Sequence, residues 1–265
     1  MEPAMVETVP ESVETFEIWF RKACDTKQTE VIYYAVVDKA SGLVGGYLAL
    51  RDYNPILGYV EIGLHYGPLL ARRRGATEAF YLCASYIFDT LGFNRLGWLS
   101  NNQNAVSKKA ARRLGFTFEG IGRIPRVHKN GHARDMTLWG MLREVQWPAM
   151  KRALELWLVP ENFDEAGMQR RRLEDIRDSE GWKPDDLGMT PPDFESITPT
   201  KEDAMPWALV RMSGPNVGLF EGRFVRLERL TDCTGPNSDV LWQAVLNGIN
   251  GSEASQMYCL ERLSQ

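Results

Sequence analysis

The chain has 265 residues, of which 44% are hydrophobic and 25% charged, and its formal net charge at pH 7 is -4. Such a chain can bury a sizeable core as one large domain or two small ones, and its composition is that of a soluble globular protein. The negative charge gives no general electrostatic reason to bind nucleic acid, and no apolar stretch approaches the roughly 20 residues that span a bilayer.

The N-terminal third predicts one helix followed by three strands. Residues 1–14 are acidic where a signal peptide would be basic and then apolar, which favours a cytoplasmic protein with no membrane partner. An amphipathic helix is expected over residues 11–23, where Val13, Phe16 and Phe20 have helical spacing. Two β-rich runs, 31–37 and 43–50, flank the turn DKASG and predict a hairpin, and residues 59–66 predict a third strand.

The middle of the chain alternates helices and strands. A helix is predicted over residues 77–91, stopping at Gly92, followed by a strand over 95–99. A second helix, 105–114, stops at Gly115, and a strand follows over 136–142. Residues 147–158 predict a further helix with Pro148 in its first turn.

The texture changes after residue 160. Many charges and prolines with little periodicity indicate a linker over residues 161–218, and acidic residues directly after Arg170–Arg172 favour a solvated surface over a nucleic-acid patch. Residues 219–230 alternate like a strand, and a helix is expected near 239–246. We therefore expect a core (1–160), a linker (161–218) and a C-terminal strand and helix (219–265). The four cysteines show no CxxC pairing, so neither a disulfide framework nor a metal site is predicted.

Residues 59–88 carry the strongest functional signal. A predicted strand is followed by Pro68, by the run Arg72–Arg73–Arg74–Gly75, and then by a helix. Such a turn can offer successive backbone N–H groups, the positive end of a helix dipole and guanidinium charge to a polyanion. A diphosphate would fit there.

With its neighbouring motifs, this turn resembles that of the GNAT N-acetyltransferase superfamily, specifically its RimJ/RimL-like branch. The looser likeness covers residues 13–169. The resemblance implies a mixed α/β GNAT acyl-CoA N-acyltransferase fold, acetyl-CoA as co-substrate, and acetyl transfer to a primary amine of a small molecule or a protein N-terminus. The motifs that carry it, in order, are Glu61-Ile62-Gly63, Thr77-Glu78-Ala79, Asn104-Ala105-Val106-Ser107, Leu114-Gly115-Phe116, Glu119-Gly120 and Arg123.

The resemblance also implies which residues hold the coenzyme. In the family, a backbone N–H on the strand with Glu61 polarises the thioester carbonyl, and the turn holds the diphosphate. The turn departs from the common pattern, because the register set by Thr77 puts Arg74 where a glycine is usual. A register shifted by one residue puts Arg72 and Gly75 at the usual first and glycine positions, but then Thr77 stands last in place of glycine or alanine. Arg74 is then expected to need an unusual dihedral or to add a charge contact. The implied coenzyme-binding residues are Ile62, Gly63, Leu64, Arg72, Arg73, Arg74, Gly75, Ala76, Thr77, Asn104 and Ser107.

The catalytic groups are less sharply indicated. By resemblance, Ser107 donates a proton to the leaving thiolate, although Asn and Ser at a helix start are also ordinary caps. The glutamate that serves as base in the ribosomal-protein acetylating members corresponds to Arg126, which cannot accept a proton. The remaining candidates for the base are Glu61, Glu119, His128 and Asp135. Glu119 and Asp135 also suit a structural role, with Arg123 or Arg134 as ion-pair partners.

The C-terminal segment suggests a rearranged chain. In the RimJ/RimL-like branch, a segment similar to residues 219–246 opens the domain, whereas here it closes the chain. We therefore expect a circular permutation in which the tail completes the sheet. The tail would dock in its own chain, or in a second copy to make a homodimer by strand exchange. A truncated tandem copy is the alternative.

Three other functions compete with acetyl transfer. Arg126 and the altered turn would suit a non-catalytic acyl-CoA binding protein. An interaction module could use the linker with Trp182, Trp207 and Trp242. Nucleic-acid modification through the run 108–113 is disfavoured, because the net charge is negative and Ala110 and Ala111 turn part of that run toward the core.

Overall fold

The computed structural model describes residue 18 and residues 31–102, 104–127, 133–184 and 219–229. They contain one mixed sheet in the order β5-β6-β4-β3-β2-β1-β8-β7, in which only β3 and β4 are parallel neighbours. The strands are β1 (Ile32–Asp38), β2 (Val44–Asn54), β3 (Tyr59–Tyr66), β4 (Arg95–Asn101), β5 (Thr117–Val127), β6 (Ala133–Leu142), β7 (Leu219–Glu221) and β8 (Val225–Arg229).

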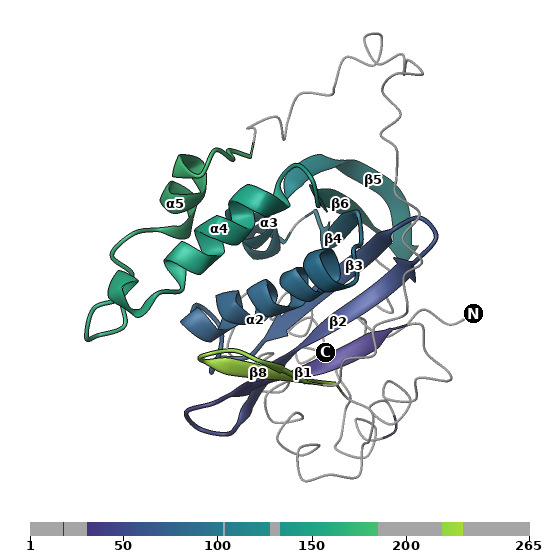
Figure 1. Ribbon diagram of the computed structural model, residues 1–265. Helices are drawn as coiled ribbons and strands as arrows, with labels where there is room; N and C mark the ends of the chain where they lie inside the picture. Colours follow the sequence, from purple (N-terminus) through teal and green to yellow (C-terminus); the bar gives the residue numbers. More distant parts are fainter. Residues whose placement is uncertain (1–17, 19–30, 103, 128–132, 185–218, 230–265) are drawn as a thin grey trace.

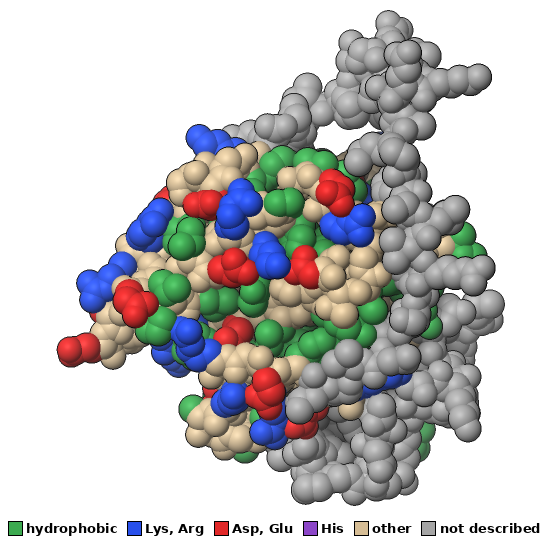
Figure 2. All heavy atoms as spheres, viewed as in Figure 1, with side chains coloured by type: hydrophobic (Ala, Val, Ile, Leu, Met, Phe, Trp, Pro, Cys, Tyr) green, Lys and Arg blue, Asp and Glu red, His purple; other side chains and the backbone are tan. Residues whose placement is uncertain are grey.

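Helices cover one face of this sheet (Figure 1). The central helix α2 (Arg74–Ser85) continues through a π-helical turn (Tyr86–Thr90), and α3 (Ala105–Arg113) follows β4. After β6 come α4 (Trp147–Trp157), a 3-10 turn (Pro160–Asn162) and α5 (Leu173–Ser179). Figure 2, viewed from the same side, shows basic and acidic side chains interspersed over these elements rather than one basic patch.

The core lies between α2 and the sheet. Phe80 and Ile87 on the helical side, and Leu48, Ile62 and Leu96 on the strands, are almost completely removed from water. Each such side chain stabilises the fold by about 1.5–3 kcal/mol relative to exposure. On β3 the apolar residues alternate with Glu61, Gly63 and His65, so these three face the opposite side of the sheet.

The predicted mixed α/β fold is confirmed, as are the hairpin of β1 and β2 and the helices α2, α3 and α4. Helix α2 begins at Arg74, three residues before the predicted start. Strand β5 was not predicted, because register shifts on either side of Gly120 and Gly122 break the two-residue alternation of its sequence. The helices expected over residues 11–23 and 239–246 lie outside the described residues.

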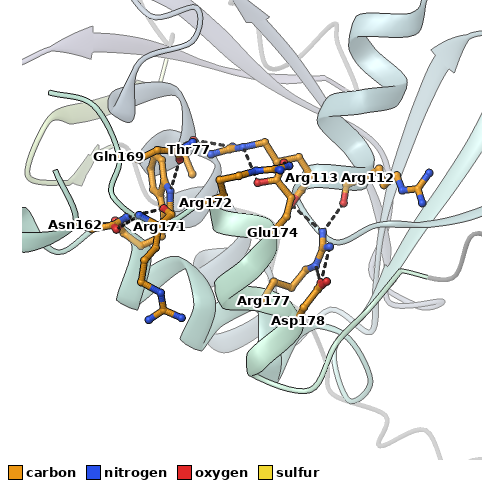
Figure 3. Close-up of polar contacts among 11 residues, drawn as sticks. Thr77, Arg112, Arg113, Asn162, Gln169, Arg171, Arg172, Glu174, Arg177 and Asp178 are labelled. Carbon is orange, nitrogen blue, oxygen red and sulfur yellow. Dashed lines mark hydrogen bonds and ion pairs between the residues drawn. The ribbon is translucent and has the colours of Figure 1, made fainter. Parts of the chain in front are cut away.

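Residues 161–184 were expected to belong to the linker, and this was wrong. Leu173 and Ile176 of α5 are buried, and the guanidinium of Arg177 donates to the carbonyl oxygens of Arg112 and Arg113 at 2.8 and 3.3 Å (Figure 3). The charge-rich composition did not indicate that this segment packs on the rest of the domain. In the sequence, an arginine that satisfies the last carbonyls of a neighbouring helix cannot be told from a surface charge.

The C-terminal segment joins the sheet of its own chain. Strand β8 pairs antiparallel with β1, from Tyr34 opposite Arg229 to Asp38 opposite Val225. The single strand predicted over residues 219–230 is instead two strands, because the chain turns at Gly222, whose amide donates to the carbonyl of Val225 at 2.8 Å. No helix among the described residues is long and apolar enough to cross a membrane.

Candidate active site

The parallel strands β3 and β4 separate part of the way along their length. Their pairing ends at Glu61 opposite Gly97, although β3 stays paired with β2 as far as Tyr66 and β4 with β6 as far as Asn101. Beyond Glu61, no strand in the described part of the chain pairs with the edge of β3 that faces β4. Such an edge can pair with an amide-bearing ligand. Ile62, Gly63 and Leu64, predicted to bind the coenzyme, lie on it.

The turn between β3 and α2 leaves backbone amides at the start of the helix. The amides of Ala71, Arg73 and Ala76 donate to backbone carbonyls within the turn at 2.8–3.2 Å. Among the described residues, no hydrogen-bond acceptor is found for the amides of Arg72, Arg74 and Gly75. Arg73, at the N-cap, makes no side-chain capping bond, and the first turn carries no acidic residue. This helix start can therefore receive an anion.

The three arginines of the turn differ in their surroundings. Arg72 and Arg73 are exposed, whereas the guanidinium of Arg74 lies 4.7 Å from the ring centroid of Phe163 and 4.4 Å from that of Phe224. The unusual dihedral expected at Arg74 falls instead on Arg72, with φ of 61°. The reason is that Arg74 is already the first residue of α2, so the left-handed residue of the turn comes two positions earlier.

Gly75, Ala76 and Thr77 are partly enclosed by neighbouring elements. A Cβ on Gly75 would lie 2.7 Å from Val225 Cγ1, so the close approach of β8 requires glycine there. The carbonyl of Ala76 accepts from the Tyr66 hydroxyl at 3.1 Å. The Thr77 hydroxyl accepts from Arg113 Nη1 at 3.1 Å (Figure 3). These contacts therefore hold residues 75–77 from behind, while Arg72 and Arg73 at the front of the turn are exposed.

Asn104 and Ser107 meet at the start of α3. Asn104 Oδ1 accepts from the amide of Ser107 at 2.9 Å, which is a helix N-cap. Ser107 Oγ accepts from the indole Nε1 of Trp98 at 3.0 Å. Trp98 is the first residue of β4 after the last pair with β3, so Ser107 lies beside the point where the strands separate. Trp98 could not be predicted from the sequence, because its contact with Ser107 arises from the crossing of β4 and α3.

Glu61 is the candidate base closest to this point. It is the last residue of β3 paired with β4, and it is buried with 6% of its surface exposed. Its Oε1 lies 3.7 Å from Nε of Arg51 on the neighbouring β2. The Arg51 guanidinium also covers Gly63, whose Cβ would lie 2.5 Å from it. Arg51, which was not singled out from the sequence, therefore holds the carboxylate of Glu61 on the face opposite α2.

Glu119 and Asp135 are the other two carboxylates proposed as the base. Both carboxylate oxygens of Glu119 accept from the guanidinium of Arg95, so its ion-pair partner is Arg95 and not Arg123 as expected. Asp135 is exposed on β6, next to Met136, which pairs with Asn101 at the far end of β4. The side chain of Arg134 and residue His128 lie outside what the structure describes.

His65 also lies on the face of Glu61, and the sequence analysis did not single it out. Its ring stacks on that of Tyr47, with centroids 5.1 Å apart. Desolvation by the surrounding protein, and then the charge of Arg51, lower the pKa of His65 to about 4. The ring of His65 is therefore uncharged at neutral pH.

Comparisons with known proteins agree with this architecture. A family model of the acetyltransferase (GNAT) domain matches residues 1–117. A GCN5-related N-acetyltransferase from Brucella melitensis is 45% identical, with 65% of this chain and 76% of that chain covered and a TM-score of 0.62. A probable acetyltransferase of the GNAT family from Chromobacterium violaceum is 35% identical, with 52% and 69% covered and a TM-score of 0.48. A search of curated proteins found no match.

The chain belongs to the GNAT acetyltransferase superfamily. It is an N-acetyltransferase, as the resemblance implied, and members of this superfamily take the acyl group from acetyl-CoA or another acyl-CoA.

Proposed function

We propose that this enzyme transfers an acetyl group from acetyl-CoA to a primary amine of a small molecule or a peptide, such as a protein N-terminus. The observation that carries the proposal is the separation of β3 from β4 next to the uncapped start of α2. One feature suits the amide-bearing arm of the coenzyme and the other suits its diphosphate, and they adjoin in the chain.

The coenzyme would lie along the open edge of β3 and end at α2. Ile62, Gly63 and Leu64 offer backbone groups to the pantetheine arm, and one of their amides would polarise the thioester carbonyl. The amides of Arg72, Arg74 and Gly75 would donate to the diphosphate, and the exposed guanidinium groups of Arg72 and Arg73 would add positive charge. Ala76 and Thr77 would shape this site from behind, and the side-chain NH2 of Asn104, at the start of α3, would donate to the coenzyme.

Ser107 would protonate the leaving group. The acceptor nitrogen forms a bond to the thioester carbon while the carbon–sulfur bond breaks, and the thiolate takes a proton. Trp98 Nε1 donates to Ser107 Oγ, which holds the oxygen in place and leaves the hydroxyl proton free to point at the sulfur.

Glu61 is the best-placed proton acceptor for the incoming ammonium. It is at the separation point, and Arg51 holds it on the face from which an acceptor could approach without crossing α2. Both carboxylate oxygens of Glu119 are hydrogen-bonded to Arg95, whereas Arg51 Nε lies 3.7 Å from Glu61, and Asp135 lies at the far end of β4, so they rank below it. We expect Glu61→Gln to lower kcat more at low pH than at high pH, because fewer amines are then already deprotonated. An unchanged pH profile would remove Glu61 from this role.

We further propose that the chain is a circular permutation of a RimJ/RimL-like domain in the cytoplasm. Its support is the hairpin of β7 and β8, which pairs with β1 and extends the sheet with residues from the C-terminal part of the chain. Exchange of this hairpin between two copies would give a homodimer. Light scattering over a range of concentrations distinguishes a monomer, whose hairpin docks in its own chain, from an exchanged dimer, because only the dimer dissociates on dilution.

The main experiment tests binding and turnover separately. Isothermal titration with coenzyme A tests the site, and thiol release from acetyl-CoA over a panel of small amines and N-terminal peptides tests the reaction. Binding together with amine-dependent thiol release supports the proposal. Coenzyme binding without thiol release in the presence of any amine would favour the non-catalytic acyl-CoA binding protein. Arg126 in place of the family's glutamate is the feature that supports that alternative. No binding would reject both.

A further inference from the structure

We propose that the C-terminal hairpin, residues 219–229, is part of the coenzyme site, because it holds the first turns of α2 in the conformation that binds the diphosphate. Glu78 is the positioning residue in this arrangement. The inference rests on the proposed function, since it assumes that the start of α2 receives the coenzyme.

Glu78 joins the helix to the turn of the hairpin. Its carboxylate accepts from three successive backbone amides, those of Arg223, Phe224 and Val225, at 2.6, 2.5 and 2.8 Å. The residue is 5% exposed and lies 145 residues away from Arg223 in sequence. Hydrogen bonds from amides to a buried carboxylate are among the strong ones, and a run of successive amides is a typical anion-binding arrangement.

Two further contacts reach the same end of α2. Val225 of β8 packs against Gly75, where a Cβ would come within 2.7 Å of its side chain. Phe224 lies against the guanidinium of Arg74, which Phe163 contacts as well. In Figure 1 the hairpin accordingly lies alongside α2. Arg74, Gly75 and Glu78 thus all contact the hairpin, and the amides of Arg74 and Gly75 belong to the proposed diphosphate site.

These contacts couple hairpin docking to coenzyme binding. If the hairpin undocks, Glu78 loses three donors, and Arg74 and Gly75 lose their contacts with Phe224 and Val225, so the first turns of α2 are no longer held in this arrangement. Coenzyme binds the arranged turn more tightly than the rearranged one. By linkage, the docked hairpin then raises coenzyme affinity, and bound coenzyme holds the hairpin down by the same factor.

The test compares two variants at opposite ends of one helical segment. Glu78→Gln keeps the size of the side chain but turns one carboxylate oxygen into a donor that faces backbone amides. Asp89→Asn is the matched control, because Asp89 at the far end accepts from Trp147 and pairs with Lys151, away from the hairpin. Phe224→Ala is a milder second variant that leaves the amides in place.

We expect Glu78→Gln to raise the Kd for coenzyme A, measured by titration, by about tenfold. This lies within the roughly 5- to 150-fold range of coupled sites. Asp89→Asn should lower the melting temperature and leave this Kd unchanged. Turnover of Glu78→Gln should recover at saturating acetyl-CoA, so that KM rises while kcat holds. If Glu78→Gln does not fold, Phe224→Ala is judged by the same criterion with a smaller expected shift.

Hydrogen exchange of the wild-type chain gives an independent readout. Coenzyme A should slow exchange at the amides of Arg223, Phe224 and Val225, although these donate to Glu78 and not to the coenzyme. Unchanged exchange there, or equal Kd values for wild type, Glu78→Gln and Phe224→Ala, would overturn the inference and leave the proposed function intact. A wild-type chain that does not bind coenzyme A would instead reject the proposed function and this inference with it.

Discussion

Asn104 offers the sharpest test of the candidate site, because its two possible roles respond differently to one change. Its Oδ1 caps α3 by accepting from the amide of Ser107 at 2.9 Å. Replacement by alanine removes this bond and costs about 1 kcal/mol of the free energy of unfolding. For a folded body of this size, that loss corresponds to a melting temperature lower by about 2–4 °C.

The coenzyme-binding role adds a second effect. If the Asn104 amide NH2 donates to the coenzyme, its loss costs about 0.5–1.5 kcal/mol of binding free energy, or a roughly two- to twelvefold weaker Kd. Asparagine and aspartate cap helices about equally well, but aspartate has no NH2 to donate. Asn104→Asp should therefore keep the wild-type melting temperature and still weaken coenzyme binding.

Calorimetry measures both quantities on the same samples. Scanning calorimetry gives the melting temperature of wild type, Asn104→Ala and Asn104→Asp, and titration with coenzyme A gives the Kd of each. If Asn104→Asp binds coenzyme A as tightly as the wild type, Asn104 is a helix cap and nothing more. The assignment of Asn104 to the coenzyme site would then be refuted.

Three further predictions address single residues. Ser107→Ala should lower kcat about 10²- to 10⁴-fold, as expected for loss of a general acid, with little change in the Kd for coenzyme A; an unchanged rate of thiol release would contradict it. Arg72→Glu should weaken coenzyme binding, and the difference from wild type should shrink at high salt, because Arg72 is exposed; equal titration curves at low salt would count against it. Burial raises the pKa of Cys83 to about 12, so its thiol should resist alkylation at pH 8 in the folded chain and react after denaturation, as peptide mass mapping would reveal; rapid labelling of the native protein would exclude this burial.

Local patterns were enough to predict most of the sheet and helices. Strands β1 and β2 are β-rich runs on either side of a turn, and β3 alternates between apolar and other residues. Gly92 and Gly115 follow the ends of α2 with its π-helical turn and of α3. The same patterns failed for β5, where the irregular register near Gly120 interrupts the alternation. They also failed for α5, which packs through only a few apolar residues.

The contacts that define the site are mostly between distant residues. Trp98 and Ser107 meet because β4 and α3 cross, and Arg51 reaches Glu61 because β2 and β3 pair in one register. Neither residue type nor spacing in the sequence indicates such partners. The family resemblance named Ser107 and Glu61, whereas only the fold reveals what holds each of them in place.

The two helix starts at the site show why the tail matters for the chemistry. Helix α3 is capped by its own Asn104, which satisfies the amide of Ser107 without a ligand. Helix α2 has neither a side-chain cap nor an acidic residue in its first turn, and three arginines adjoin it. The positive end of the helix dipole and the arginine charges repel one another until an anion binds. A contact from outside the helix is therefore needed to hold the first turn in its conformation. Glu78, anchored on the hairpin amides, supplies that contact from one side while leaving the amides of the turn for phosphate.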